Sequence, residues 1–376
     1  MVQRVLWVEE ILDNNDIEIA IFLKMNTQLQ QPKKHLNDVY VIRPIAIFLL
    51  VVYHSFIIYR GGWRQPVDFQ YVELYDWIAT LCSAFRLELL VFCSGYLFAL
   101  TLTRKQQSFW KMASSKAKRL LLPSVVFSAI YVILFYNTKE RTVGELLLAI
   151  VSGAGHMWYL PMLYWVMLMC YGVDKINYPN WLKIAGLAAL PALSILPLPL
   201  QIDRATYYAL FFYLGMLIYR NRDVIIAKIK TIKQVVLWLL IFVCVYAVGL
   251  YISEGGMMDT YMNSDNLIEK AIAVEIIKYV KIVYCILGII FIYILVNYFL
   301  EVKKISVAPW VINLSGLCFG IYLFQQFILQ ILYYKTQLPS LVGPYWLPWV
   351  GLVITLILSY LLTKLSLKTK LGRQLM

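Results

Sequence analysis

An arginine and a histidine interrupt the first long apolar segment of the chain. Arg43 and His54 lie eleven positions apart in VIRPIAIFLLVVYH. That spacing is about 1100° of α-helix, which returns to within roughly 20° of the same face, and it separates the residues by about 16.5 Å. We therefore expect one helix face to carry a cation near a membrane surface and an imidazole near mid-membrane. An imidazole suits general-base catalysis near neutral pH, and an arginine suits the binding of an anion.

A second apolar segment contains two further ionisable side chains, Arg86 and Glu88, in FRLELLVFCSGY. A charged group at the centre of a membrane helix costs about 2.5–3.5 kcal/mol on insertion scales, so a segment that retains one generally uses it. Two residues apart on a helix, these side chains point about 200° away from each other and need separate partners. We expect Glu88 to lie at a depth similar to that of His54 and to orient its imidazole.

Purely structural interpretations of these residues stay open. Hydrogen bonds between buried polar residues hold membrane helices together, which would account for His54 without any chemistry. Arg43 could be an interfacial anchor whose stem lies in hydrocarbon while its head reaches water. Ser94-Gly95 is better explained as a site of close helix packing than as a nucleophile. The three histidines of the sequence are too few and too scattered to predict a metal site.

The composition requires membrane helices to position these residues. Of the 376 residues, 61% are hydrophobic and 15% are charged, whereas soluble domains have about 45–50% apolar and 25% charged residues. A soluble globular enzyme is therefore excluded. One membrane helix needs about 20 apolar residues. The sequence contains ten apolar segments, at 41–59, 77–103, 121–136, 157–173, 184–200, 205–219, 235–252, 281–300, 311–334 and 345–365.

The predicted fold is an all-α integral membrane protein, a polytopic bundle of about ten transmembrane helices. The amphipathic stretch 142–155 would add an eleventh segment if it re-enters the membrane. The 34 Lys and Arg residues collect mainly in alternate loops, and the positive-inside rule then puts both termini in the cytoplasm. The same rule accounts for the net charge of +13 without a nucleic-acid partner. We expect residues 1–36 to be a cytoplasmic extension, with Met25 as an alternative natural start, and 37–376 to be the membrane domain.

Five short motifs in this layout are similar to those of the membrane-bound acyltransferase family 3, whose members O-acylate polysaccharides and other envelope or secreted molecules. The family's first-helix signature is an Arg, ten residues and a His, and its second helix has an acidic residue six positions before Ser-Gly. The matching residues are Arg43 and His54, Glu88, Lys116 with Arg119 and Pro123 in KAKRLLLP, HMWYLP from His156 to Pro161, and GIYLF at 320–324. Many relatives carry a His directly after the last motif, whereas this chain has Gln325 and Gln326, so we assign no proton transfer there.

The resemblance implies a membrane-bound O-acyltransferase that transfers an acyl group, usually acetyl, from cytoplasmic acyl-CoA. The acceptor would be a hydroxyl of a cell-envelope or exported glycan or a lipid-linked saccharide, and the enzyme would be a multi-pass protein of a bacterial inner (plasma) membrane, in contact with membrane lipid. Acetyl-CoA would enter as a substrate, with no tightly bound cofactor. Arg43, Lys116 and Arg119 would bind its phosphates.

The resemblance also implies roles for the remaining site residues. His54 would be the general base and Glu88 its orienting residue. Arg86 would either stabilise the developing oxyanion or contact the pantetheine arm of CoA. His156 and Trp158 would line the acceptor site, although both also suit the aromatic belt of a membrane interface.

Two alternatives belong to other functional classes. A polytopic glycan or lipid transporter, or flippase, would use Arg43, His54, Arg86 and Glu88 as a substrate or proton pathway. It would need an inverted repeat or paired broken helices, and neither is evident in the sequence, although Pro191, Pro197 and Pro199 could break the helix of segment 184–200. A membrane sensor or scaffold has little support, because the sequence leaves no room for a sizeable domain outside the membrane.

Overall fold

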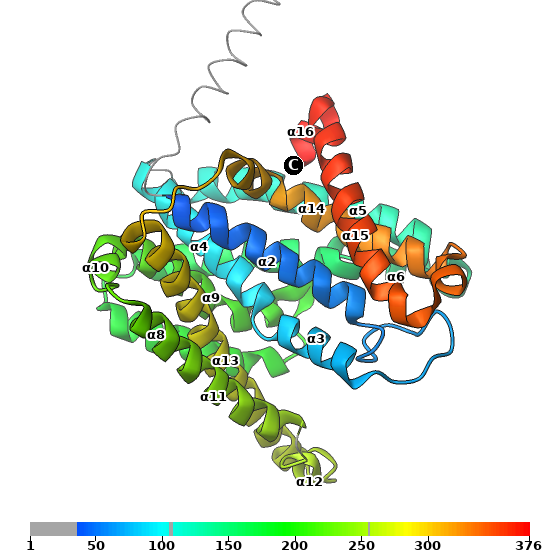
Figure 1. Ribbon diagram of the computed structural model, residues 1–376, viewed down its shortest axis with the longest axis horizontal. Helices are drawn as coiled ribbons and strands as arrows, with labels where there is room; N and C mark the ends of the chain where they lie inside the picture. The colour runs from blue at the N-terminus through cyan, green and yellow to red at the C-terminus, as the bar shows by residue number, and fades with distance from the viewer. Residues whose placement is uncertain (1–35, 105–107, 255) are drawn as a thin grey trace, which may run out of the picture.

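The computed structural model describes residues 36–104, 108–254 and 256–376, and within these ranges the chain is all-helical and contains no strand. The predicted extension 1–36, with Met25, lies almost wholly outside the described residues. The helices form a bundle with α2 running through its middle (Figure 1). In chain order they are α2 (Asn37–Phe56), α3 (Glu73–Ser83), α4 (Arg86–Arg104), α5 (Phe109–Phe135), α6 (Val143–Ser152), α7 (Tyr159–Lys175), α8 (Asn180–Ala189), α9 (Ile202–Arg220), α10 (Arg222–Ala227), α11 (Ile232–Glu254), α12 (Asp259–Met262), α13 (Leu267–Asn297), α14 (Pro309–Tyr334), α15 (Leu338–Lys368) and α16 (Lys370–Leu375).

The number of membrane spans is smaller than the number of apolar segments. Among the described residues, seven helices are long and apolar enough to cross a membrane, or eight if α6 and the following helix are one bent span. The segments 184–200 and 205–219 fall on α8 with its 3-10 extension and on α9, and neither is among these candidates. The prediction of ten spans is therefore not confirmed, and the cytoplasmic location of both termini stays a prediction.

The amphipathic stretch 142–155 forms a helix that is sharply bent against its neighbour. Thr142 and Glu145 make a capping box that begins α6, an arrangement in which each side chain bonds the other's backbone N–H. Gly153 has a φ of +90°, a left-handed conformation that ends the helix. The chain then continues into α7 at an angle of 59°. The stretch is thus one arm of a broken span or a re-entrant loop.

The closest helix contact in the centre of the bundle joins α4 to α9. A Cβ atom added to Gly95 would lie 1.9 Å from the carbonyl oxygen of Phe212, and one added to Gly215 would lie 2.1 Å from that of Phe92. Only glycine fits at such a backbone-to-backbone crossing, as small residues do in membrane helix interfaces. The Ser94 hydroxyl donates to the Leu90 carbonyl of its own helix at 2.9 Å. Gly95 is thus a site of close helix packing, whereas Ser94 lines a cavity between the helices.

A buried ionic cluster fixes the start of α2. Asp38 is fully buried and accepts hydrogen bonds from the Arg222 Nε at 3.1 Å and from the Tyr96 hydroxyl at 2.8 Å. The Arg222 guanidinium also lies 3.4 Å from Glu301. Because a buried carboxylate is stable only when it is paired, this cluster ties α2 to α4, to α10 and to the segment after α13.

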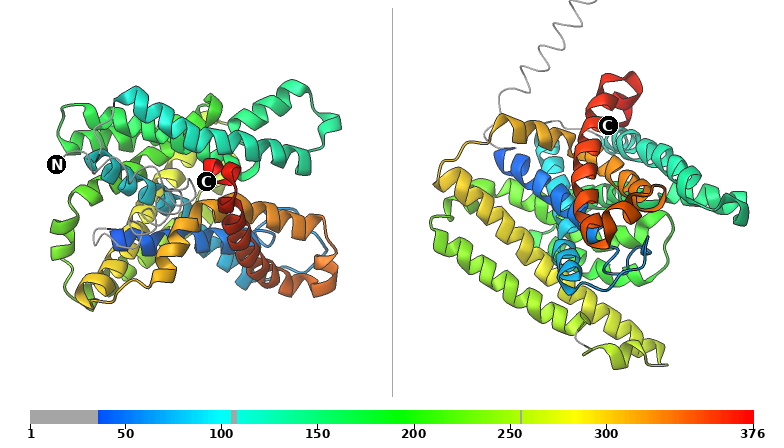
Figure 2. Two further views of the ribbon diagram at one scale, coloured as in Figure 1. Left: turned by 90° about the horizontal axis from the view of Figure 1, so that it is seen from above. Right: turned by 45° about the vertical axis from the view of Figure 1, so that its right-hand side comes forward.

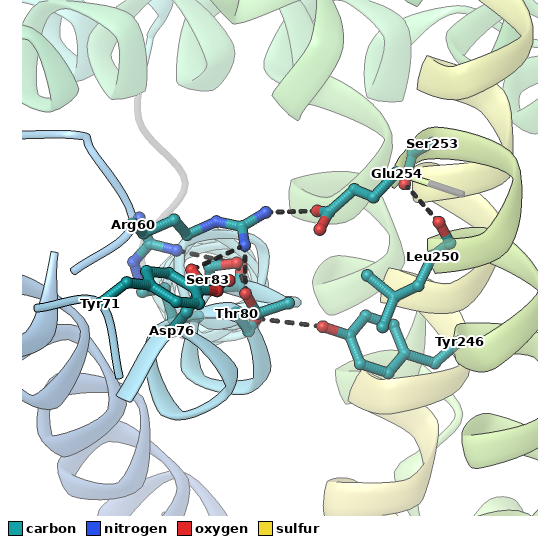
Figure 3. A network of polar contacts seen from close by, with 10 residues as sticks. Arg60, Tyr71, Asp76, Thr80, Ser83, Tyr246, Leu250, Ser253 and Glu254 are labelled. Carbon is teal, nitrogen blue, oxygen red and sulfur yellow. Dashed lines mark hydrogen bonds and ion pairs between the residues drawn. The ribbon is translucent and has the colours of Figure 1, made fainter. Parts of the chain in front are cut away.

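At the other end of α2, a polar network anchors the loop that follows the helix (Figure 3). The Arg60 guanidinium lies 3.3 Å from the Asp76 carboxylate and also contacts Thr80 and Glu254, which belong to α3 and α11. Burial alone would lower the pKa of Arg60, but the Glu254 and Asp76 carboxylates outweigh it and raise the pKa. The Tyr246 hydroxyl joins by donating to the Thr80 carbonyl at 3.0 Å. The network therefore holds the loop against α11, which runs beside α13 along one flank of the bundle (Figures 1 and 2).

Candidate active site

Two cavities lie along α2, one toward each end of the helix. The first, of about 160 Å³, has Arg43, Lys116 and Arg119 in its lining. The second, of about 220 Å³, has His54 in its lining, together with Trp63, Arg86, His156, Trp158 and Gln326. Tyr159 and Tyr322 line both cavities. The two cavities therefore meet at a pair of tyrosines, whose ring centroids are 5.4 Å apart.

His54 occupies the last turn of α2 and faces the second cavity. The sequence predicts a depth near mid-membrane, which stays a prediction; α2 ends at Phe56, and the chain then turns toward Gly61, whose φ is +74°. The imidazole stacks on the Trp63 indole with centroids 5.7 Å apart and an interplanar angle of 11°. Its Nδ1 lies 2.9 Å from the Oε1 of Gln325. Because a carboxamide oxygen only accepts, Nδ1 donates this hydrogen bond and Nε2 keeps a free lone pair.

Glu88 is not the residue that orients His54. Its carboxylate is buried, accepts a hydrogen bond from the Tyr207 hydroxyl at 3.1 Å and lies 3.7 Å from the Lys281 Nζ. These partners belong to α9 and α13, whereas the partner of the imidazole, Gln325, belongs to α14. The expected contact fails because Glu88 faces a different side of α4 from the cavity. A neutral carboxamide takes the orienting position.

Arg86 is the one charged residue of α4 that lines the His54 cavity. The predicted continuous segment 77–103 is broken after α3, so Arg86 is the first residue of α4. Its guanidinium carbon lies 3.5 Å from the centroid of the Tyr53 ring, and Nη1 donates to the Ser83 carbonyl at 3.0 Å. The Nε of Arg86 is buried and has no hydrogen-bond partner among the described residues. Arg86 and Glu88 thus find separate partners, as their spacing predicts.

A second imidazole, that of His156, lines the same cavity and is buried. Its Nε2 lies 3.0 Å from the Leu323 carbonyl oxygen, which makes Nε2 the donor. Its Nδ1 has no partner in the part of the chain that the structure describes. The His156 carbonyl accepts a hydrogen bond from the Tyr322 hydroxyl. His156 and Trp158 therefore lie in one cavity with His54.

The first cavity is cationic. Arg43 comes from α2, while Lys116 and Arg119 come from α5, which begins at Phe109 because the Ser108 side chain caps it. Lys116 Nζ also lies 5.6 Å from the centroid of the Phe98 ring. None of the described residues lining this cavity is acidic. Three like charges in one cavity repel each other, so the arrangement favours the binding of a polyanion.

Gln325 is the site residue whose role the sequence does not reveal. It is fully buried, and its Nε2 has no hydrogen-bond partner among the described residues. The only signal in the sequence is its position directly after GIYLF, where many members of the family that the sequence resembles have a His. No group of three or more His, Cys, Asp or Glu that could hold a metal occurs within 36–104, 108–254 and 256–376.

The bundle and its cavities define a helical membrane protein with a polar site between its helices. Residues 37–364 match the model of the acyltransferase family 3, which is described as an acyltransferase domain. The chain therefore belongs to this family of membrane acyltransferases, and acyl transfer is its general activity. No curated protein and no solved structure matches the chain.

Proposed function

We propose that the protein transfers an acyl group, most simply acetyl, from acyl-CoA to a hydroxyl of a cell-envelope or exported glycan. The observation that carries this proposal is the meeting of a cationic cavity and a cavity with a free imidazole nitrogen at Tyr159 and Tyr322. Such a pair of cavities suits a reaction with two substrates that differ in charge. The enzyme would be a multi-pass protein of a bacterial inner membrane, with the Arg43 end of α2 on the cytoplasmic side.

The donor would bind in the cationic cavity. CoA carries several phosphate charges, and charge-assisted hydrogen bonds to guanidinium and ammonium groups are strongest away from bulk water. Arg43, Lys116 and Arg119 supply such donors. Arg43 and His54 lie eleven positions apart along α2, about 16.5 Å. The pantetheine arm would span this distance and bring the thioester to the two tyrosines.

The acceptor hydroxyl would bind in the His54 cavity. Nε2 of His54 takes the hydroxyl proton while the hydroxyl oxygen attacks the thioester carbonyl carbon, and Gln325 holds the ring in the tautomer that leaves Nε2 free. The resulting oxyanion develops close to Arg86, whose unpaired Nε–H can donate to it. The C–S bond then breaks, and the CoA thiolate takes the proton from the imidazolium. The products are the O-acyl ester and CoA.

Transfer of label from acetyl-labelled CoA tests the proposal. Membranes that contain the protein should produce alkali-labile label in glycan or lipid-linked saccharide fractions, and His54→Ala should abolish it. The matched control is His35→Ala, since His35 precedes the residues that match the family. Undiminished transfer in His54→Ala would refute the role of His54. The absence of CoA-dependent label with any acceptor would favour the transporter alternative.

A further inference from the structure

An open groove adjoins the His54 cavity at Trp158. It has a volume of about 400 Å³ and is lined by Trp158, Ser194, Asp203, Arg204, Tyr207 and Tyr208. Trp158 lines both the groove and the cavity. A ligand in the groove would therefore be next to a ligand whose hydroxyl reaches His54.

The groove has the chemistry of a saccharide site. The Trp158 ring has the Arg204 guanidinium carbon 4.2 Å from its centroid and the Tyr208 ring 6.2 Å away. Arg204 covers one face of the Trp158 ring, and the exposed part of this ring offers apolar surface to the C–H face of a sugar, while carboxylates accept from its hydroxyls and guanidinium groups donate to them. Arg204 forms no ion pair with an acidic residue in the described part of the chain, so its N–H donors remain for a ligand. Asp203 and Arg204 balance in charge, which suits a neutral sugar.

Glu88 is hydrogen-bonded to one residue in the wall of this groove. Its carboxylate accepts the hydrogen bond of the Tyr207 hydroxyl at 3.1 Å, and Tyr207 lines the groove. Arg86 and Glu88, the two charged residues at the start of α4, thus act on different binding regions. Arg86 faces the cavity of the reacting hydroxyl, whereas Glu88 acts on the groove through Tyr207.

We propose that the groove is a second saccharide subsite, which binds the neutral sugar unit next to the unit that is acylated. The acceptor is then an oligosaccharide of at least two units, and Glu88 is a positioning residue for its second unit. This inference rests on the proposed function, because it takes the His54 cavity as the place where the acceptor hydroxyl reacts.

The test measures the dependence of transfer on acceptor length. The acceptors are N-acetylglucosamine and its β-1,4-linked di-, tri- and tetramers, with a parallel glucose series, and the donor is labelled acetyl-CoA. In whichever series serves as acceptor, we expect the KM of the wild-type protein to be about tenfold lower for the dimer than for the monomer. A factor of about ten is what a few added contacts to a second sugar unit would supply. Arg204→Ala should raise the dimer KM about five- to tenfold and leave the monomer KM and acetyl-CoA KM unchanged. Tyr207→Phe, which keeps the ring but loses the bond to Glu88, should change the dimer KM in the same direction.

The control is Arg141→Ala, because Arg141 is also exposed and lies 4.7 Å from the centroid of an aromatic ring, that of Tyr136, but lines neither the groove nor the cavity. It should behave as wild type. Equal monomer and dimer KM values in the wild-type protein would overturn the second subsite alone. So would an Arg204→Ala variant whose KM still falls from monomer to dimer as much as that of the wild-type protein. No label on any saccharide of either series would count against the glycan acceptor itself, and the subsite would fall with it.

Discussion

Replacement of Gln325 by leucine tests whether the carboxamide sets the tautomer of His54. The Nδ1 to Oε1 distance of 2.9 Å is that of a well-formed hydrogen bond. Leucine has a similar volume but no acceptor, so the buried Nδ1–H would be left unsatisfied, at a cost of about 1–3 kcal/mol. The neutral tautomer with its proton on Nε2 would then compete with the tautomer that has its proton on Nδ1, and only the second tautomer can act as the base through Nε2. Because 1.4 kcal/mol corresponds to a factor of ten, we expect kcat to fall about 5- to 150-fold.

The assay separates catalysis from binding. The imidazole should remain stacked on Trp63, and the cationic cavity does not include Gln325, so the KM for acyl-CoA should change little. Gln325→His should retain part of the activity, because an imidazole nitrogen can also accept from Nδ1. Gln330→Leu is the matched control, since Gln330 is buried on the same helix but is not the residue that bonds His54. A kcat within twofold of wild type in Gln325→Leu, or an equal loss in Gln330→Leu, would refute the reasoning.

Two further predictions concern the donor side and the helix crossing. Arg43→Ala should raise the acyl-CoA KM about 10- to 150-fold with kcat little changed, since a charge-assisted hydrogen bond contributes about 1.5–3 kcal/mol; a lower kcat at unchanged KM would give Arg43 a role in the chemistry. Gly95→Ala should destabilise the protein by about 1–3 kcal/mol, because its methyl group would overlap the Phe212 carbonyl, and the melting temperature in detergent should fall. Gly144→Ala, where the added Cβ meets open space, should not lower it, and equal melting temperatures for the two variants would contradict the crossing.

Much of the helical layout can be predicted from the apolar pattern, because an apolar segment of sufficient length forms a membrane helix whichever helices it later packs against. Every predicted segment falls largely on helical structure. The boundaries are less predictable, since they depend on local caps. Ser108 starts α5 twelve residues before the predicted segment 121–136, and the basic run between them becomes helical. The break between α3 and α4 lies in a sequence with neither proline nor glycine, so only the structure reveals that Arg86 begins a helix.

The site is predictable where one helix determines it and unpredictable where two helices meet. Arg43 and His54 both belong to α2, so their spacing alone predicts that they lie on the same helix face, where each lines one of the two cavities. The partners of His54 and Glu88 lie 271 and 119 positions away along the chain, on α14 and α9. No periodicity within a segment encodes such contacts. The sequence therefore suggests a plausible pairing of Glu88 with His54 that the packing of α4 against α9 does not allow.

The two tyrosines between the cavities have a consequence for the membrane itself. Tyr159 and Tyr322 are both almost fully buried, and the Tyr322 hydroxyl is held by the His156 carbonyl. Without their rings, the two cavities along α2 would join into one larger cavity. Under the proposed function, the two rings would separate the donor cavity from the acceptor cavity and would limit the leakage of protons and ions between the two ends of the bundle.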